Sequence, residues 1–295
     1  MIELPAPPPP WELPLPPAVL HDGIHVLRGV RYVSELGFRP VRMDLYLPAV
    51  GPAPAVIFIH GGAWLFGDRD GVGPMYMTMV PDVFTALAQR GIAVISIDYR
   101  TSEEALFPAQ LHDVAAAHRF VVARADELGI DAGRLAVWGE SAGGHLAMLL
   151  AFCQGDAEAL GDSGAPIDCP PLVGLVDWYG VSDIRLPMGE ALMPGPTPEE
   201  RLVGGPIDEH PALAQAASPI TRVSADAPPT LVVHGTGDTL IPVERSQEVV
   251  AALRAAGVEV EALWIDGAQH AWLGSPAAAD QALDATVAFL HRQLG

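Results

Sequence analysis

The stretch LAVWGESAGGHLAMLLAF, residues 135–152, decides the fold class of this chain. Its first four residues are apolar and typical of a buried strand, and the run after Gly144 has the composition of a helix. Between them stands G-x-S-x-G at residues 139–143, the pattern of a nucleophile elbow. The flanking glycines fit this turn because larger side chains would collide with the adjoining strand and helix. The order strand, turn and helix predicts that Ser141 projects free at a helix N-terminus, where the helix dipole favours negative charge.

Short apolar runs recur on both sides of this stretch and predict the rest of the fold. Several, such as AVIFIH (55–60), are apolar on both faces, as expected of parallel strands covered by helices. Helix-length segments lie between them, one from Pro108 to Gly129 and another from about Pro242 to Ala256. The alternation predicts an α/β fold with a mostly parallel eight-stranded sheet, helices on both faces and an antiparallel start. The candidate strands are His25–Val33, Val41–Leu47, Ala55–His60, Ile92–Tyr99, Leu135–Trp138, Val173–Trp178, Thr230–His234 and Val258–Ile265.

The strand pattern also predicts the domain organisation. The 295 residues suffice for one large core, so residues 1–295 are expected to form one domain. Eight of the first seventeen residues are Pro, which predicts that residues 1–20 form an extended surface arm. Residues from about 181 to 229 are rich in Pro and Gly and are typical of a small lid or pocket wall. The two cysteines, Cys153 and Cys169, match neither a disulfide framework nor a metal site, and are interpreted as packing residues.

Charge and hydropathy exclude several classes of partner. The formal net charge of −20, from 16 Lys and Arg against 36 Asp and Glu, repels polyanions. Nucleic acid and anionic membrane surfaces are therefore not expected as partners, whereas neutral or cationic small molecules are. The apolar runs are far shorter than the roughly 20 residues that span a bilayer, and the first residues lack the pattern of a secretory signal. These features predict a cytoplasmic protein, and an edge strand near the C-terminus could support a homodimer.

A second motif, HGGAW at residues 60–64, ends a predicted strand. A tetrahedral intermediate of acyl transfer carries an oxyanion that needs preorganised N–H donors, and glycines let the backbone turn such donors inward. The predicted oxyanion hole consists of the N–H groups of Gly62 and Ala63, together with that of Ala142 directly after the nucleophile. His60 is interpreted as a residue that braces this loop.

The order of residues along the chain selects the base and the acid. In this architecture the nucleophile is followed first by the acid and then by the histidine. Asp238 follows the strand before the last and is predicted to accept a hydrogen bond from the base. Its rival, Asp266, lies too close along the chain to His270 for the usual layout. His270, in the loop after the last strand, is the predicted base, whereas His291 is interpreted as a surface residue and His234 as structural.

Six segments together carry a family resemblance: HGGAW (60–64), IDYRTSEEALFPAQLHDV (97–114), VWGESAGGHLA (137–147), SPITRV (218–223), PPTLVVHGTGDTLIPVE (228–244) and GAQHAW (267–272). They resemble the hormone-sensitive-lipase-related esterases, especially the bacterial group similar to bifunctional feruloyl and acetyl-xylan esterases. The resemblance covers the chain from about Tyr32 onward and implies an α/β-hydrolase fold, an acyl-enzyme and no cofactor. That family commonly has HGGG where this chain has Ala63, and many relatives carry apolar helical caps in place of the Pro-rich arm. Feruloyl or xylan specificity is therefore not inferred.

The catalytic triad predicted from these residues is Ser141, Asp238 and His270, which needs no metal. The expected function is that of a serine carboxylesterase, which hydrolyses small to medium carboxylic esters through an acyl-enzyme. An amidase or peptidase with the same triad is the alternative, because ester and amide hydrolysis differ in leaving group and pocket shape. The complete triad disfavours a non-catalytic receptor, and a dehalogenase would need a carboxylate in place of Ser141. Residues that could line the acyl pocket, or simply pack in the core, are Trp64, Phe66, Met75, Tyr76 and Met77.

Overall fold

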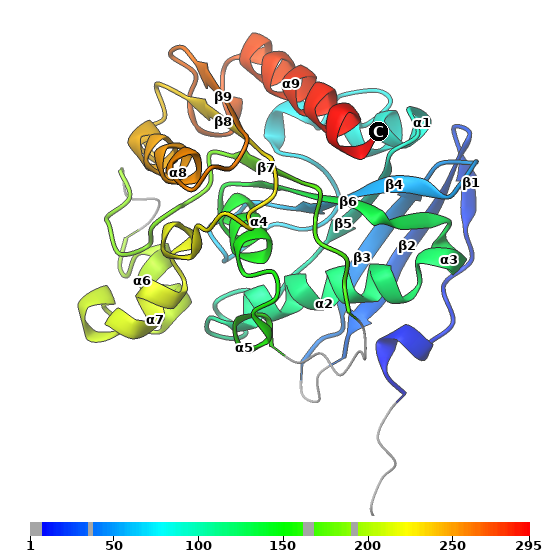
Figure 1. Ribbon diagram of the computed structural model, residues 1–295, viewed down its shortest axis with the longest axis horizontal. Coiled ribbons are helices and arrows are strands. Elements are labelled where there is room, and N and C mark those ends of the chain that lie inside the picture. Colours follow the sequence, from blue (N-terminus) through cyan, green and yellow to red (C-terminus); the bar gives the residue numbers. More distant parts are fainter. Residues whose placement is uncertain (1–7, 35–37, 162–167, 190–193) are drawn as a thin grey trace, which may run out of the picture.

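A nine-stranded sheet forms the centre of the computed structural model, which describes residues 8–34, 38–161, 168–189 and 194–295 (Figure 1). The strands lie in the order β1-β2-β3-β5-β4-β6-β7-β8-β9. Pairing is antiparallel from β1 through β3 to β5 and parallel across the rest of the sheet. The strands are β1 (Val19–His21), β2 (Ile24–Val33), β3 (Val41–Leu47), β4 (Ala53–Ile59), β5 (Ala93–Ile97), β6 (Ile130–Glu140), β7 (Gly174–Trp178), β8 (Thr230–Gly235) and β9 (Val260–Ile265).

The predicted sheet is confirmed in its arrangement, with one strand more than expected. Each of the eight candidate ranges overlaps a strand, and the antiparallel start is present. The additional strand, β1, pairs with β2 and places Val19 opposite Val26. Its three residues are all exposed, so they give neither an alternating nor a continuous apolar pattern. Residues 1–7 of the predicted arm and 190–193 of the predicted lid lie outside the described residues.

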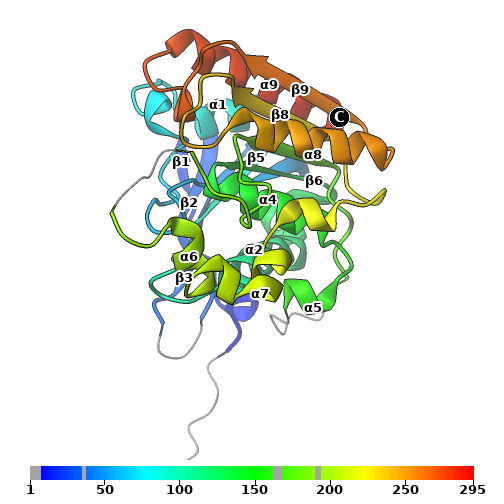
Figure 2. The ribbon, with the colours of Figure 1, turned by 90° about the vertical axis from the view of Figure 1, so that its left-hand side faces the viewer.

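Helices cover both faces of the sheet, with α1 and α9 on one side and α2, α4 and α8 on the other (Figures 1 and 2). Side chains of a strand alternate between these faces. In β4, Ile57 and Ile59 pack toward α2 and α4, whereas Val56 and Phe58 pack toward α1 and α9. Two buried faces explain the continuous apolar runs in the sequence. The helices are α1 (Val83–Gln89), α2 (Ala109–Ala123), α3 (Ala125–Leu128), α4 (Ala142–Phe152), α5 (Ala157–Leu160), α6 (Pro198–Val203), α7 (Pro211–Ala216), α8 (Val243–Ala255) and α9 (Pro276–Leu294).

The two helices predicted from Pro and Gly signals are present. The segment after Pro108 forms α2 and α3, which are separated at Arg124. Gly129 caps the end of α3 with a left-handed φ of 65°. The Arg124 guanidinium donates through Nη1 to the carbonyls of Trp11 and Leu13, and so fixes the described part of the arm beside this helix pair. The described residues before β1, 8–18, are exposed or only partly buried.

The segment after β7 packs against the α2 and α4 side of the molecule. It forms α6 and α7, and α6 begins with a capping box in which Thr197 and Glu200 exchange hydrogen bonds. Leu202 of α6 and Ala214 of α7 are buried in the same core cluster as α2 and α4. The N–H of Phe107 donates to the carbonyl of Leu202, which joins this segment to the chain just before α2.

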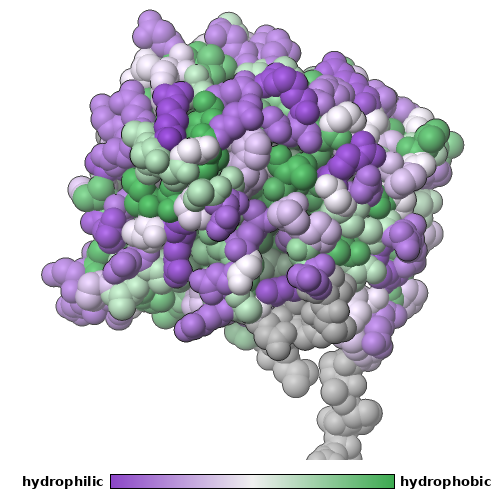
Figure 3. All heavy atoms as spheres, in the orientation of Figure 1, coloured by the Kyte–Doolittle hydropathy of each residue, from purple (hydrophilic) through white to green (hydrophobic). Residues whose placement is uncertain are grey.

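The surface combines hydrophilic residues with small apolar groups. On the face in Figure 3, hydrophobic residues form separate groups among hydrophilic ones.

Cys153 is a buried free thiol, and Cys169 is a free thiol that is only partly buried. None of the helices formed by the described residues is long and apolar enough to cross a membrane.

Phe58 provides a test of the core packing. Its ring is fully buried and lies 5.0 Å from that of Phe84 and 4.8 Å from that of Trp138, centroid to centroid. We expect Phe58→Ala to lower the free energy of unfolding by about 3–5 kcal/mol, measured by urea denaturation, because it leaves a cavity. Val50→Ala, at a position 82% exposed, should stay within about 0.5 kcal/mol of the wild type. A loss below about 1 kcal/mol for Phe58→Ala would contradict this packing.

Candidate active site

Ser141 stands alone in the sharp turn between the last residue of β6 and the first residue of α4. Its backbone has φ 53° and ψ −118°, which is strained for a residue with a side chain. Two hydrogen bonds hold this conformation: the Ser141 N–H donates to the Trp178 carbonyl at 2.8 Å, and the Ser141 carbonyl accepts from the His145 N–H at 3.0 Å. The hydroxyl is thereby presented at the N-terminus of α4.

Glycine is required beside Ser141 because the backbone segments approach very closely. A Cβ at position 139 would lie 2.1 Å from the Gly143 carbonyl oxygen. A Cβ at position 143 would lie 2.0 Å from the carbonyl oxygen of Ile59, at the end of β4. Real Cβ atoms do not come so close to backbone oxygens, so the G-x-S-x-G spacing has the steric origin expected from the sequence.

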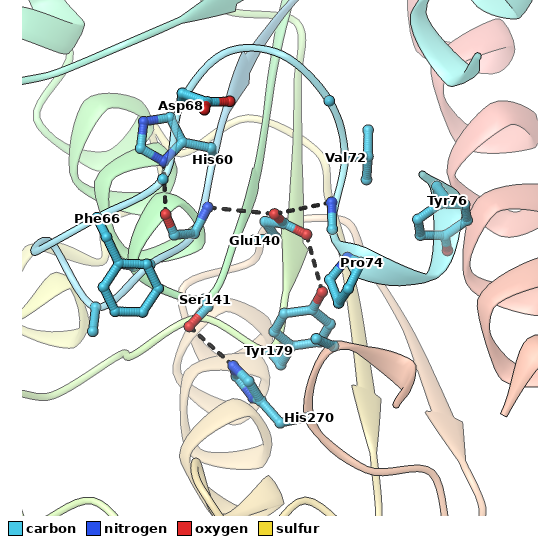
Figure 4. A pocket seen from close by; sticks show the side chains of 18 of the residues that line it. His60, Phe66, Asp68, Val72, Pro74, Tyr76, Glu140, Ser141, Tyr179 and His270 are labelled. Atoms are coloured by element: carbon cyan, nitrogen blue, oxygen red, sulfur yellow. Dashed lines mark hydrogen bonds between the residues drawn. The ribbon is translucent and has the colours of Figure 1, made fainter. Parts of the chain in front are cut away.

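The structure brings Ser141, His270 and Asp238 into one hydrogen-bonded chain. His270 Nε2 lies 3.1 Å from Ser141 Oγ, and His270 Nδ1 lies 2.7 Å from Asp238 Oδ2 (Figure 4 shows the first contact). Because a carboxylate only accepts, Nδ1 carries the proton, and Nε2 is left to accept from the serine hydroxyl. His270 comes from the short 3₁₀ helix η5 (His270–Trp272), and Asp238 from the turn after β8.

Asp238 is held as an anion. Burial alone would raise its pKa, but hydrogen bonds from His234 and His270 and from backbone N–H groups outweigh burial and hold the pKa well below its usual range. Oδ1 accepts from the N–H groups of Leu240 and Ile241, each at 2.9 Å. The carboxylate therefore has a fixed orientation and can stabilise a positive charge on His270.

His234, interpreted as structural from the sequence, directly contacts the carboxylate of Asp238. Its Nε2 lies 2.9 Å from the Ile241 carbonyl oxygen and 3.2 Å from Asp238 Oδ2, and its Nδ1 lies 2.7 Å from Ser246 Oγ. A carbonyl can only accept, so Nε2 carries the proton and Nδ1 accepts from the Ser246 hydroxyl. In the sequence, the feature that could have indicated this contact is that His234 lies near the end of β8, four residues before Asp238.

The loop of the HGGAW motif has the backbone conformation that its glycines suggest. Gly62 has φ 113°, and Ala63 and Trp64 follow with φ 54° and 58°. A Cβ at Gly62 would lie 2.0 Å from the Phe66 carbonyl oxygen, so a side chain is excluded there. Gly62, Ala63 and Ala142 line the same cavity as Ser141.

His60 lies behind this loop rather than beside the nucleophile. Its ring stacks on that of Tyr99, with centroids 4.5 Å apart and planes 15° apart, and the Tyr99 hydroxyl donates to the His60 carbonyl. Burial lowers the pKa of His60, which keeps the ring neutral. These contacts fit a residue that braces the loop.

The rival residues lie away from the Ser141–His270 pair. Asp266 is exposed and accepts from the Thr236 hydroxyl at 3.2 Å, and His291 is exposed on α9. Within the described part of the chain, no group of three or more His, Cys, Asp or Glu residues could hold a metal ion.

A cavity of about 640 Å³ opens at Ser141 (Figure 4). Its described lining contains four carboxylates, those of Asp68, Asp70, Asp82 and Glu140, and neither Lys nor Arg. The remaining lining is largely apolar, and four of the five suggested pocket residues belong to it, whereas Met75 does not. Its apolar and aromatic members are Ala63, Trp64, Phe66, Val72, Pro74, Tyr76, Met77, Val83, Phe84, Ala142, Tyr179, Val181, Met188, Leu240, Ile241 and Ala271.

Two contributors to this site were missed by the sequence analysis. Glu140 is the first variable residue of G-x-S-x-G, and Tyr179 directly follows β7 with an unusual φ of 41°. The Tyr179 hydroxyl donates to Glu140 Oε2 at 3.1 Å, and its ring lies 4.6 Å from that of His270, centroid to centroid. Neither position carries a sequence pattern of its own, because these contacts join separate loops.

Comparisons with known proteins relate this chain to esterases. A family model described as BD-FAE matches residues 43–253. The chain is 36% identical to esterase LipC of Mycobacterium tuberculosis over 74% of this chain and 53% of LipC. It is 34% identical to the probable carboxylic ester hydrolase LipM of the same organism, over 82% of this chain and 54% of LipM. The chain thus spans about half the length of these curated relatives. The structure of a truncated carbohydrate esterase from gut microbiota matches with a TM-score of 0.79 at 26% identity, covering 94% of this chain and 99% of that chain.

The close approach at position 139 can be tested by substitution. Gly139→Ala forces a Cβ against the Gly143 carbonyl, so we expect the free energy of unfolding to fall by at least about 2 kcal/mol in guanidinium titrations. Gly133→Ala, in the same strand, meets only the Asp131 carboxylate at 3.4 Å and should change stability by less than about 0.5 kcal/mol. Equal stability of the two variants would rule out the steric explanation.

Proposed function

The chain belongs to the BD-FAE family and has the α/β-hydrolase fold, and on this premise we propose that it is a serine carboxylesterase. The proposed substrates are small to medium carboxylic esters, cleaved through an acyl-enzyme intermediate. The observation that carries the proposal is the hydrogen-bonded triad Ser141–His270–Asp238, of which Ser141 and His270 line a large cavity. This arrangement activates a serine hydroxyl without any other group.

Each of the three residues Ser141, His270 and Asp238 has a defined role in the proposed reaction. His270 Nε2 removes the hydroxyl proton as Ser141 Oγ attacks the ester carbonyl, and the imidazolium that forms is stabilised by Asp238. His270 then returns the proton to the departing alkoxide, and an alcohol leaves. Water, deprotonated by His270, then attacks the acyl carbon, and His270 returns this proton to Ser141 Oγ as the bond between Oγ and the acyl group breaks and the acid leaves.

The negative charge of the tetrahedral intermediate needs donors that are in place beforehand. Gly62 and Ala63 turn the loop through positive φ angles beside Ser141, and Ala142 begins α4. Their N–H groups are the proposed oxyanion hole, and loss of one such donor typically costs about 3 kcal/mol. Ala63, which replaces the third glycine of HGGG, still has a backbone N–H to donate.

The cavity and the relatives support an ester as substrate. A volume of about 640 Å³ is within the usual range of small-molecule sites and exceeds the needs of an acetyl group alone. The relatives are named as esterases or carboxylic ester hydrolases, which does not favour the amidase or peptidase alternative. A single domain, a lid formed by residues 181–229, a cytoplasmic location and a homodimer stay predictions from the sequence.

The proposed activity can be tested with p-nitrophenyl esters of increasing acyl length alongside a p-nitroanilide. We expect short and medium esters to be hydrolysed and the anilide to resist. Ser141→Ala should lower kcat by roughly 10⁶, as for other serine nucleophiles. Preferential cleavage of the anilide would favour the amidase alternative, and activity unaffected by Ser141→Ala would refute the assigned nucleophile.

The identity of the acid can be tested with a pair of matched variants. Asp238→Asn removes the carboxylate that fixes the proton on His270 Nδ1, so kcat should fall by about 10⁴. Asp266→Asn changes a residue that contacts Thr236 instead, and should leave kcat within about twofold of the wild type. The reverse pattern in steady-state kinetics would assign the acid to Asp266.

A further inference from the structure

Glu140 is a buried carboxylate beside the nucleophile that the proposed reaction does not use. It is the last residue of β6 and is 7% exposed. Oε1 accepts from the N–H groups of Gly61 at 3.4 Å and Gly73 at 3.3 Å, and Oε2 accepts from the Tyr179 hydroxyl at 3.1 Å (Figure 4). One side chain thus connects three loops around the cavity.

Each of these three partners positions a different part of the site. Gly61 begins the loop that carries the proposed oxyanion donors, and Gly73 belongs to the segment that walls the cavity. A Cβ at Gly73 would lie 2.9 Å from Glu140 Oε2, so the carboxylate fits closely against the backbone there. The Tyr179 ring packs between His270, at 4.6 Å, and Trp272, at 4.8 Å, measured between ring centroids. Glu140 therefore contacts the oxyanion loop directly and is linked to the base through Tyr179.

The chemistry of the contacts favours an ionised carboxylate. All three hydrogen-bond partners are donors, and an ionised carboxylate accepts from all of them. Burial raises the pKa of Glu140 above its usual value, and these hydrogen bonds and a positive His270 oppose that shift without reversing it. The titratable side chains around it are His270 and three tyrosines whose pKa values burial raises well above 10, so they stay neutral; these tyrosines are Tyr76, Tyr99 and Tyr179. His270 is thus the neighbour of Glu140 whose charge changes during the proposed reaction.

We propose that Glu140 is a positioning residue. Its carboxylate fixes the position of the oxyanion loop relative to the base, and its charge stabilises the imidazolium of His270. The role in catalysis rests on the proposed function. The contact with Tyr179 and the charge near His270 are properties of the folded protein and do not depend on which substrate is cleaved. The proposal can therefore be tested separately from hydrolysis.

The first test measures the pKa of His270 by NMR titration, with its signal assigned from its absence in His270→Gln. Glu140→Gln keeps an oxygen for the N–H groups of Gly61 and Gly73 but removes the charge. Because a nearby negative charge favours the imidazolium, we expect the pKa of His270 to fall by about half a unit or more. An unchanged pKa would overturn the electrostatic part of the proposal.

A matched control is available at Glu199, on α6. It is a buried glutamate, 3% exposed, whose pKa burial also raises, and it does not line the cavity. Glu199→Gln makes the same chemical change at a distance and should leave the pKa of His270 as in the wild type. An equal shift in both variants would mean that the effect is not local, and would overturn the proposal.

The second test uses kcat/KM for a p-nitrophenyl ester across pH. Glu140→Ala removes all three hydrogen bonds and should lower the optimal kcat/KM about 100-fold, whereas Glu140→Gln should recover about tenfold of that loss. In Glu140→Gln the acid limb of the profile should move to lower pH, following the base. A loss of twofold or less in Glu140→Ala would overturn the positioning role. A wild type inactive on every ester, with the His270 pKa still shifted in Glu140→Gln, would refute the esterase function but support the coupling.

Discussion

The site depends on the lack of space between α4 and the ends of the central strands. Carbonyl oxygens lie only 2.1 and 2.0 Å from where Cβ atoms would stand at positions 139 and 143. The first turn of α4 can therefore rest directly on β4 and β6, and Ser141 is forced into a backbone conformation that side chains normally avoid. The strain is balanced by hydrogen bonds and packing on both sides. Because β4, β6, β7 and β8 are parallel, their following loops meet at this same edge, where ligands bind in such sheets.

Two carboxylates influence His270, one through a direct hydrogen bond and one across a tyrosine ring, and the protein shifts their pKa values in opposite directions. Asp238 accepts directly from the ring, and its hydrogen bonds hold its pKa low despite burial. Glu140 acts across the Tyr179 ring, and burial raises its pKa. An isolated buried anion is costly, and each of these is kept by several donors. A positive charge on the base is therefore stabilised by Asp238 in direct contact and by Glu140 from behind Tyr179.

The parts of the site that lie within one short segment could be predicted from the sequence, because local sterics and turn chemistry determine them. Ser141 and the HGGAW loop are of this kind, and chain order was enough to single out His270 and Asp238. Tyr179 could not be found in this way, because its importance comes from contacts with Glu140, 39 residues away, and with His270. The contact of His234 with Asp238 could not be predicted either, because it depends on how the turn after β8 folds back against the strand. The short strand β1 gave no signal because all its side chains face solvent.

The wall of the cavity is tethered from both halves of the sheet. Arg69, in the loop after the oxyanion motif, donates through Nε to Asp44 of β3 and through Nη1 to Asp98 after β5, each at 2.8 Å. Farther along the same loop, Gly73 donates to Glu140 of β6. Asp44 is 1% exposed, whereas the Arg69 side chain is 21% exposed, and an ion pair of this kind adds little net stability when it is intact. These charges therefore act mainly by fixing the position of the loop. The fold thus shapes the cavity before any ligand enters it.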